Sequence, residues 1–224
     1  MPNSPESGTA ARTEILRRIH SAGVVPADAA TIEAEWRGIN REYKRVASVD
    51  HEGLLHQLED RLLDYDAGVY RTQAAGLPEL IARILKERRK HRMAVPEGLP
   101  AEWLSVSSVE FVTDTRADLG SIDACDGVLT SATVAIAETG SIVLQDVAGE
   151  GRRAVTLLPD YHLCVVDADD VVQTVPEAIA LLQPTAHLAT TFFSGPSATA
   201  DIEMTRIKGV HGPRFVDVIL IVHN

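Results

Sequence analysis

The sequence has only two cysteines in 224 residues, Cys125 and Cys164, and they form no CxxC pair. A cluster held by four thiolates therefore cannot be built from this chain alone. So few thiols in a chain of this length are typical of a reducing compartment. The N-terminal segment also lacks the charged start and apolar stretch of a signal peptide. We therefore predict a cytoplasmic protein with no cofactor bound by this chain alone.

Aromatic residues are scarce as well, at 4% of the sequence, so Ala, Val, Leu and Ile must fill the core. Apolar residues make up 45% and charged residues 24%, which is typical of a soluble globular protein. The run 178–200 carries no formal charge and is long enough to span a bilayer. Pro184 and Pro196 make it a poor membrane helix, and we predict no membrane span.

Positive charge is scarce in the second part of the chain. Residues 1–100 hold 15 basic and 15 acidic side chains, whereas residues 101–224 hold 6 basic and 17 acidic ones. The net charge of −11 therefore lies entirely in the second part. This acidic field repels a polyanion, so nucleic acid and anionic membranes are excluded as main partners. A small anion can still bind where one of the six cations lies beside backbone amides.

Several motifs with known chemistry are absent. The sequence contains no GxxxxGK[ST] phosphate loop, no GxGxxG after a predicted strand, no HExxH and no GxSxG. The eight histidines are scattered, without a pair at metal-ligand spacing on a predicted helix face. We therefore predict no metal site.

Residues 1–48 form a predicted helical extension, separate from the domain over 49–224. The apolar side chains of its second helix recur at spacings of 4, 3 and 4, at Ile32, Trp36, Ile39 and Tyr43. An earlier helix is expected to end at Gly23. We expect this arm to pack on the main body or on a second copy, which allows a homodimer. A peripheral membrane helix is the alternative, but the polar face mixes charges of both signs.

From residue 49 onward, predicted strands alternate with helices. Helices are predicted over 51–65, 77–91 and 176–182, and another begins near Thr199. The predicted strands are 66–72, 91–96, 109–114, 133–138, 141–146, 162–167, 191–193 and 215–222. This alternation predicts an α/β fold with a mostly parallel sheet that is covered on both faces. The AETGS step at 137–141 predicts a tight turn that adds an antiparallel hairpin.

Two glycine-bearing segments supply the first candidate site residues. In AIAETGSIVL (135–144), Glu138 ends an apolar strand and precedes Thr139 and Gly140. A carboxylate at the carboxyl end of a strand lies where α/β sheets bind ligands, although Glu138 could instead accept N–H groups of the turn. In GEGRRAVTLLPDYH (149–162), Gly151 precedes Arg152, whose guanidinium can clamp a carboxylate or phosphate. The alternative is a surface loop whose arginines balance local Asp residues.

Two further segments follow. SGPSATADIEMTRIKG (194–209) predicts a loop into a helix N-terminus, where free amides can hold an anion; capping alone also explains the composition. Its candidate residues are Ser194, Gly195, Ser197, Thr199 and Asp201. In GVHGPR (209–214), His211 offers a titratable ring beside Gly212 and Arg214. A lone histidine can also serve local hydrogen bonds only.

These four segments, in this order and at this spacing, resemble the LUD-domain family of lactate-utilisation C proteins over roughly residues 50–222. The resemblance implies a three-layer α/β/α sandwich like that of the NagB/RpiA/CoA-transferase group. It also implies a role in the oxidation of L-lactate to pyruvate with iron–sulfur partner proteins. This chain would be the subunit without cluster-binding motifs, a possible component of a lactate-oxidising complex.

Two other functions stay open. The ETGSIVL stretch is similar to the sequence around the nucleophilic glutamate of CoA transferases, which implies that Glu138 attacks an acyl-CoA to form an anhydride and then a thioester. The sequence departs from that family because it shows no early glycine loop for CoA. The third possibility is a non-catalytic assembly module.

The leading hypothesis makes a geometric prediction. If the four segments converge, Arg152 or Arg214 holds the carboxylate of a 2-hydroxy acid, and His211 or Glu138 takes its hydroxyl proton. All four segments should then line one electropositive hollow.

Overall fold

The computed structural model describes residues 5–22, 28–43, 45–105, 108–116, 118–200, 206–209 and 211–223. The chain divides into two compact units, 1–43 and 44–224. The first unit contains α1 (Pro5–Ser21) and α2 (Ala29–Gly38). Asp28 caps α2 by accepting a hydrogen bond from the Thr31 N–H.

The apolar stripe of the first unit is partly helical. Ile32 and Trp36 lie in α2, but the helix ends at Gly38, and Ile39 is extended. The predicted helix, which runs through Tyr43, is therefore too long. The prediction followed the apolar spacing of the sequence, and that spacing continues past Gly38, where the helix ends. Gly23, the predicted cap of α1, lies outside the described residues. The unit itself leaves these apolar side chains uncovered, since Ile32 is 56% and Trp36 63% exposed.

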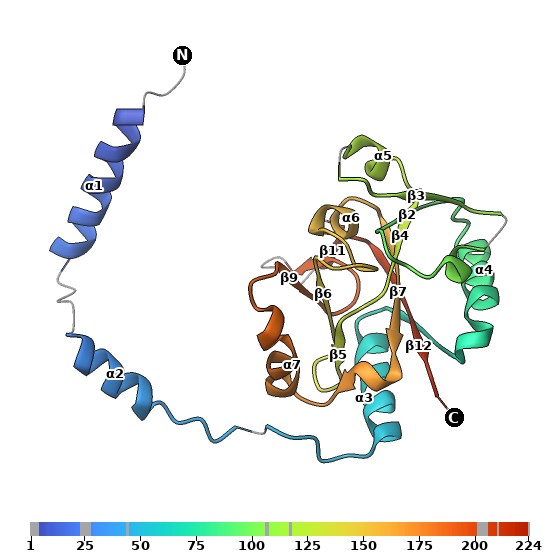
Figure 1. Cartoon of the computed structure of the whole chain (residues 1–224), viewed down its shortest axis with the longest axis horizontal. Coiled ribbons are helices and arrows are strands. Elements are labelled where there is room, and N and C mark those ends of the chain that lie inside the picture. The colour runs from blue at the N-terminus through green and yellow to red at the C-terminus, as the bar shows by residue number, and fades with distance from the viewer. Residues whose placement is uncertain are drawn as a thin grey trace. The chain divides into compact units, whose positions relative to one another are not determined.

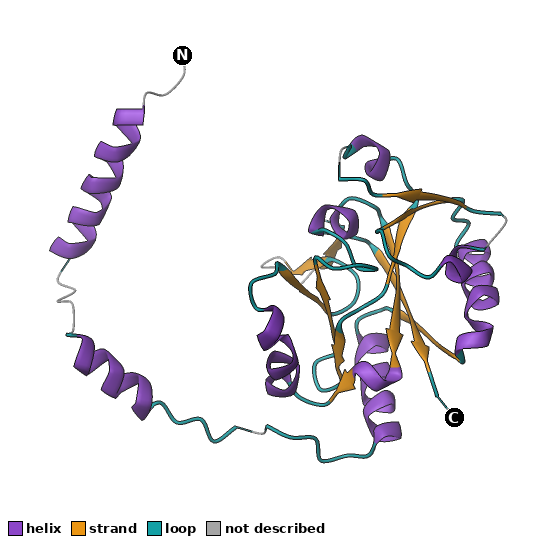
Figure 2. Ribbon diagram, viewed as in Figure 1, coloured by secondary structure: helices purple, strands orange, loops and turns teal. Residues whose placement is uncertain are grey.

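The second unit is built on a six-stranded parallel sheet (Figures 1 and 2). Its order is β1-β12-β7-β4-β2-β3, and each neighbouring pair is parallel. The strands are β1 (Gly68–Thr72), β2 (Arg92–Val95), β3 (Glu110–Thr113), β4 (Gly127–Thr130), β7 (Tyr161–Asp167) and β12 (Phe215–Ile221). β12 pairs on both sides, as its nearly continuous apolar sequence predicts.

A second, four-stranded sheet has the order β8-β5-β6-β9. It comprises β5 (Val134–Ile136), β6 (Ser141–Gln145), β8 (Val171–Val172) and β9 (Thr190–Phe193). β5 and β6 are antiparallel, which confirms the predicted hairpin at 137–141. The remaining strands, β10 (Ala198–Ala200) and β11 (Arg206–Lys208), pair with each other.

Helices cover both faces of the main sheet. The helices of the second unit are α3 (His51–Asp64), α4 (Leu77–Glu87), α5 (Gly120–Asp123), α6 (Arg153–Leu157) and α7 (Val175–Leu182), with 3-10 turns at Ala74–Gly76, Ala101–Leu104, Ala168–Asp170 and Gln183–Thr185. Alternate residues of β7 and β12 face α4 on one side and α3 with the four-stranded sheet on the other (Figure 1). α5 and α6 cover the same face as α3, and α7 packs on the outside of the four-stranded sheet. The predicted three-layer α/β fold is therefore confirmed, with the four-stranded sheet added to one layer.

The predicted helix near Thr199 is wrong, because residues 198–200 form β10. The Ser and Thr residues that resemble an N-cap instead belong to a loop and a short hairpin. The helix at 176–182 is confirmed as α7, which begins with a capping box between Thr174 and Glu177. No helix among the described residues is both long enough and apolar enough to cross a bilayer.

Candidate functional site

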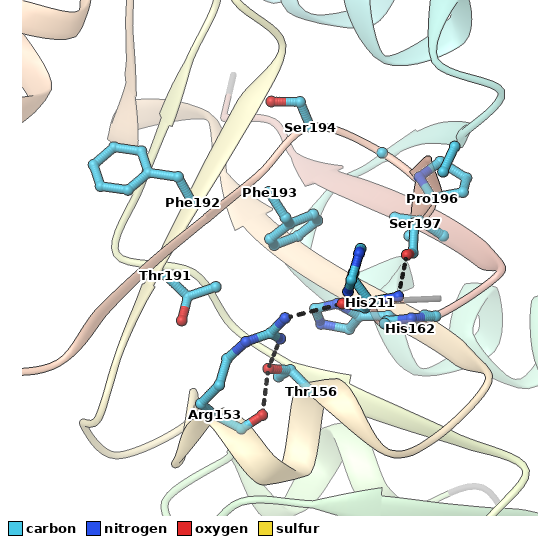
Figure 3. Close-up of a pocket in the computed structure, with 15 residues that line it drawn as sticks. Arg153, Thr156, His162, Thr191, Phe192, Phe193, Ser194, Pro196, Ser197 and His211 are labelled. Atoms are coloured by element: carbon cyan, nitrogen blue, oxygen red, sulfur yellow. Dashed lines mark hydrogen bonds between the residues drawn. The ribbon is translucent and has the colours of Figure 1, made fainter. Parts of the chain in front are cut away.

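A cavity of about 270 Å³ lies beside the first residues of β7 and β12, on the face that carries α3 (Figure 3). Its lining comes from α6, β7, β9, the 194–198 segment and the 211–213 loop. The polar side chains around it are Arg153, Thr156, His162, Thr191, Ser194, Ser197 and His211. Among the described residues that line this cavity there is no carboxylate.

Arg153 supplies the positive charge of the cavity. Its Nη1 donates to the Thr156 hydroxyl at 3.1 Å, and its Nη2 donates to the carbonyl of His211 at 3.3 Å. No carboxylate of the described residues forms an ion pair with it. Burial lowers the pKa of Arg153, yet an arginine remains a cation at any physiological pH. The guanidinium is therefore held in place, with its charge still available to an anion.

His162 lies beneath the cavity, only 2% exposed, in the buried strand β7. Its Nε2 shares a hydrogen bond of 2.8 Å with the Thr130 hydroxyl, and its ring packs on Phe193 with centroids 5.0 Å apart. Burial, together with the positive charge of Arg153, lowers the pKa of His162 to about 3. The ring is therefore neutral, and its second nitrogen has no hydrogen-bond partner among the described residues. It can offer one hydrogen bond to a bound molecule without acting as a base.

Two loops that are distant in sequence close the other side of the cavity. The Ser197 N–H donates to the carbonyl of Pro213 at 2.8 Å, and the Ser197 hydroxyl accepts from the His211 N–H at 3.0 Å (Figure 3). The structure thus brings together the predicted residues Ser194, Gly195, Ser197, His211 and Gly212.

The Glu138 turn reaches this cavity only indirectly. The Thr139 hydroxyl donates to Ser141, and Ser141 shares a hydrogen bond of 2.7 Å with Ser194. Glu138 itself lies in the turn between β5 and β6, where its N–H donates to the carbonyl of Gln173. Its predicted place at the ligand-binding edge of a parallel sheet is corrected, because β5 belongs to the four-stranded sheet.

Two glycines place these turns against the end of α3. Gly140 and Gly195 have φ values of +61° and +88°. A Cβ at Gly195 would lie 2.6 Å from Cβ of Tyr65, and one at Gly140 would lie 2.6 Å from Cβ of Arg61. The side-chain-free backbone thus allows both turns to approach the helix.

We expect Gly195→Ala to lower the free energy of unfolding by about 1–3 kcal/mol. The alanine would keep a strained positive φ, and its Cβ would overlap Cβ of Tyr65. The measurement is urea denaturation. The control is Gly120→Ala, where φ is ordinary and the nearest atom is the Asp118 carboxylate at 3.3 Å. Equal stability of the two variants would contradict this reading of the turn.

Gly151 lines a second cavity, of about 260 Å³, at the carboxyl ends of β2, β3 and β6, and so does Asp114, the partner of Arg152. Arg152 forms two hydrogen bonds of 2.8 Å with Asp114, which is 6% exposed. The Arg152 guanidinium lowers the pKa of Asp114. Arg116 pairs in the same way with Asp146. The predicted clamp residue Arg152 is thus engaged by a carboxylate of the protein itself.

The remaining predicted residues either lie away from the first cavity or fall outside the residues that the structure describes. Arg214 pairs with Asp160 at 2.5 and 2.8 Å, and its side chain is 55% exposed. Only the backbone of Thr199 is described, in β10, and Asp201 lies outside the described residues. The prediction of one shared hollow is therefore right only in part. The segments 149–162, 194–209 and 209–214 all contribute to the first cavity, but no residue of 135–144 lines it, and the predicted residues Gly151, Arg152 and Arg214 lie elsewhere.

Sequence reasoning missed Arg153 and His162 as site residues. The Arg152–Arg153 pair was visible, but only the fold shows that the first arginine meets Asp114 while the second, at the start of α6, lines the cavity. A signal for His162 was present, since a polar residue within a buried strand needs a specific partner or a specific role.

The groups suited to a metal ion lie elsewhere in the described part of the chain. Asp167, Asp169 and His223 bring three ligand atoms within 4.8 Å of one another near the ends of β7 and β12, and His223 already pairs with Asp167 at 2.7 Å. Cys125 and Cys164 are free and buried. The described residues of the two cavities can therefore offer hydrogen bonds and charge to a ligand, but they do not form a metal-ligand cluster.

The chain matches the family model of the LUD domain over residues 55–221. It is 43% identical over 181 residues to "Lactate utilization protein C" of Deinococcus radiodurans, a match that covers 80% of this chain and 84% of that protein. It is 24% identical over 207 residues to "Lactate utilization protein C" of Bacillus velezensis, covering 84% and 85%. Its fold is similar to the crystal structure of a DUF162 family protein from Deinococcus radiodurans, with a TM-score of 0.66, 37% identity and coverage of 78% of this chain and all of that one.

Proposed function

The chain belongs to the LUD domain family, and from this premise we propose that it serves lactate utilisation by binding a small 2-hydroxy or 2-oxo carboxylic acid in the cavity beside Arg153. Two observations carry the proposal. The Arg153 guanidinium has no ion-pair partner among the described residues, and the described residues that line the cavity include no carboxylate. Arginine binds a carboxylate through two parallel hydrogen bonds. The neutral His162 ring can then contact the hydroxyl or oxo oxygen.

In this proposal the reaction served is the oxidation of L-lactate to pyruvate. The hydrogens of the hydroxyl group and of C2 leave as two protons, and the two electrons pass one at a time to the clusters of the iron–sulfur partner proteins. His211 at the cavity rim is the proposed base for the hydroxyl proton, because the buried ring of His162 binds a proton too weakly to take it. The chain would act in the cytoplasm.

The apolar stripes of the first unit support assembly with partners. Ile15, Ile19, Ile32 and Trp36 stay exposed within that unit, and short isolated helices are marginally stable in water. We propose that they bind the iron–sulfur subunits or a second copy of the chain. The CoA-transferase alternative gains no such support, since Glu138 lines neither of the two cavities.

The test is to measure the binding of L-lactate and of pyruvate to the full chain by isothermal titration calorimetry. We expect Arg153→Gln to weaken binding about 10- to 100-fold, because it removes a charge-assisted pair of hydrogen bonds. The matched control is Arg214→Gln, which removes a guanidinium already paired with Asp160 at the surface. If both variants bind as the natural chain does, or if neither acid binds at all, the cavity is not the acid site.

A further inference from the structure

The cavity is larger than a three-carbon acid requires. Its volume of about 270 Å³ leaves room for an acid with more than three carbons. A lactate ion whose carboxylate lies on Arg153 leaves much of this space unfilled. An occupant that fills the cavity must carry a larger substituent than a methyl group.

The lining shows which kind of substituent fits. Arg153, Thr156 and the carbonyl of His211 form a polar cluster. Phe193, Pro213 and Val216 supply apolar surface to the same cavity, and Val216 is 2% exposed. Figure 3 shows Arg153 and Phe193 entering this space from α6 and β9. A ligand that carries both a charge and an apolar group matches a lining that offers partners for both.

Charge limits the ligand further. Arg153 is the cation among the described lining residues, and its two contacts already hold it at one place. A second carboxylate on the ligand would lose its hydration against Phe193 and Val216 without gaining a partner. Such desolvation of an unpaired charge is costly. The cavity therefore suits acids with a single carboxylate.

Resting on the proposed function, we propose that this site takes 2-hydroxy or 2-oxo monocarboxylic acids with an apolar side chain larger than methyl, with Phe193 and Val216 as the residues that determine this specificity. The carboxylate lies on Arg153, the 2-oxygen contacts the ring of His162, and the side chain packs on Phe193. Lactate, whose side chain is only a methyl group, then binds at the same place but more weakly than the larger acids of this class.

The test is a series of acids bound to the full chain: lactate, 2-hydroxybutyrate, 2-hydroxy-4-methylpentanoate, 3-phenyllactate and malate. We expect the dissociation constant to fall about threefold to fourfold for each added methylene that is buried. We expect malate to bind at least tenfold more weakly than lactate. Phe193→Ala should remove most of the gain for 3-phenyllactate while changing lactate binding less, so the ratio of the two constants is the readout.

The outcomes separate the two proposals. If lactate binds through Arg153 but the larger acids bind no better, or malate binds equally well, the inferred specificity is overturned and the proposed function stands. If no acid of the series binds, both fail. The unmodified chain decides the question by itself, so a Phe193→Ala variant that does not fold leaves the test intact.

Discussion

Arg88→Met should lower the free energy of unfolding by about 3–5 kcal/mol, because it leaves a buried carboxylate without its cation. Asp217 lies within β12 and is 0% exposed. Arg88 follows α4 and donates to both carboxylate oxygens, at 2.6 and 2.8 Å. The hydroxyl of Tyr161 donates a third hydrogen bond of 2.8 Å. Within the described part of the chain, Tyr161 is then the one side chain still bonded to the carboxylate, while methionine keeps most of the length and packing of the arginine stem.

The double variant Arg88→Met with Asp217→Asn identifies the cause. Asparagine has nearly the same shape as aspartate but no charge, so the double variant should be more stable than Arg88→Met alone. Arg214→Met, which breaks the exposed pair with Asp160, should cost no more than about 1 kcal/mol. Urea denaturation of the four proteins measures these differences. If Arg88→Met costs as little as Arg214→Met, the buried pair does not stabilise the fold.

This buried pair also shows where sequence reasoning succeeds and where it stops. The apolar run of β12 predicts an interior parallel strand, and the structure confirms it. The partner of Asp217 is 129 positions away at Arg88, and no local pattern encodes that pairing. Even the room for the carboxylate comes from another strand, since a Cβ at Gly68 would lie 2.2 Å from Asp217 Oδ1.

The candidate site follows the same division. Loops with glycine and serine at 194–197 and 209–213 are recognisable because their residue types are unusual, and the structure brings them together. Which arginine has no carboxylate partner among the described residues depends on where Asp114 and Asp160 lie in space. A short β hairpin replaces the expected helix near Thr199, because the same Ser and Thr residues suit turns as well as helix caps.

Acid should destabilise the fold through His162. The pKa of this residue is about 3 in the folded chain, against about 6.5 for an unperturbed histidine, because burial and the charge of Arg153 oppose protonation. As the pH falls below about 6.5, the unfolded chain binds a proton that the folded chain does not. The free energy of unfolding is therefore unaffected above that pH and decreases between about 6.5 and 3. The loss is about 2 kcal/mol at pH 5.

His162→Gln removes this difference in proton binding between the folded and unfolded chains, because glutamine stays neutral at every pH. Glutamine can still share a hydrogen bond with Thr130. Between pH 7 and pH 5, the variant should gain about 2 kcal/mol of stability relative to the natural chain, whatever the substitution costs at neutral pH. The comparison is His223→Gln. Asp167 raises the pKa of His223, so here the natural chain gains relative to its variant as the pH falls. A difference between the natural chain and His162→Gln that stays constant from pH 7 to pH 5 would mean that His162 has the same pKa in the folded and unfolded chains. At pH 5 the cavity would then hold two cations for an anion to bind.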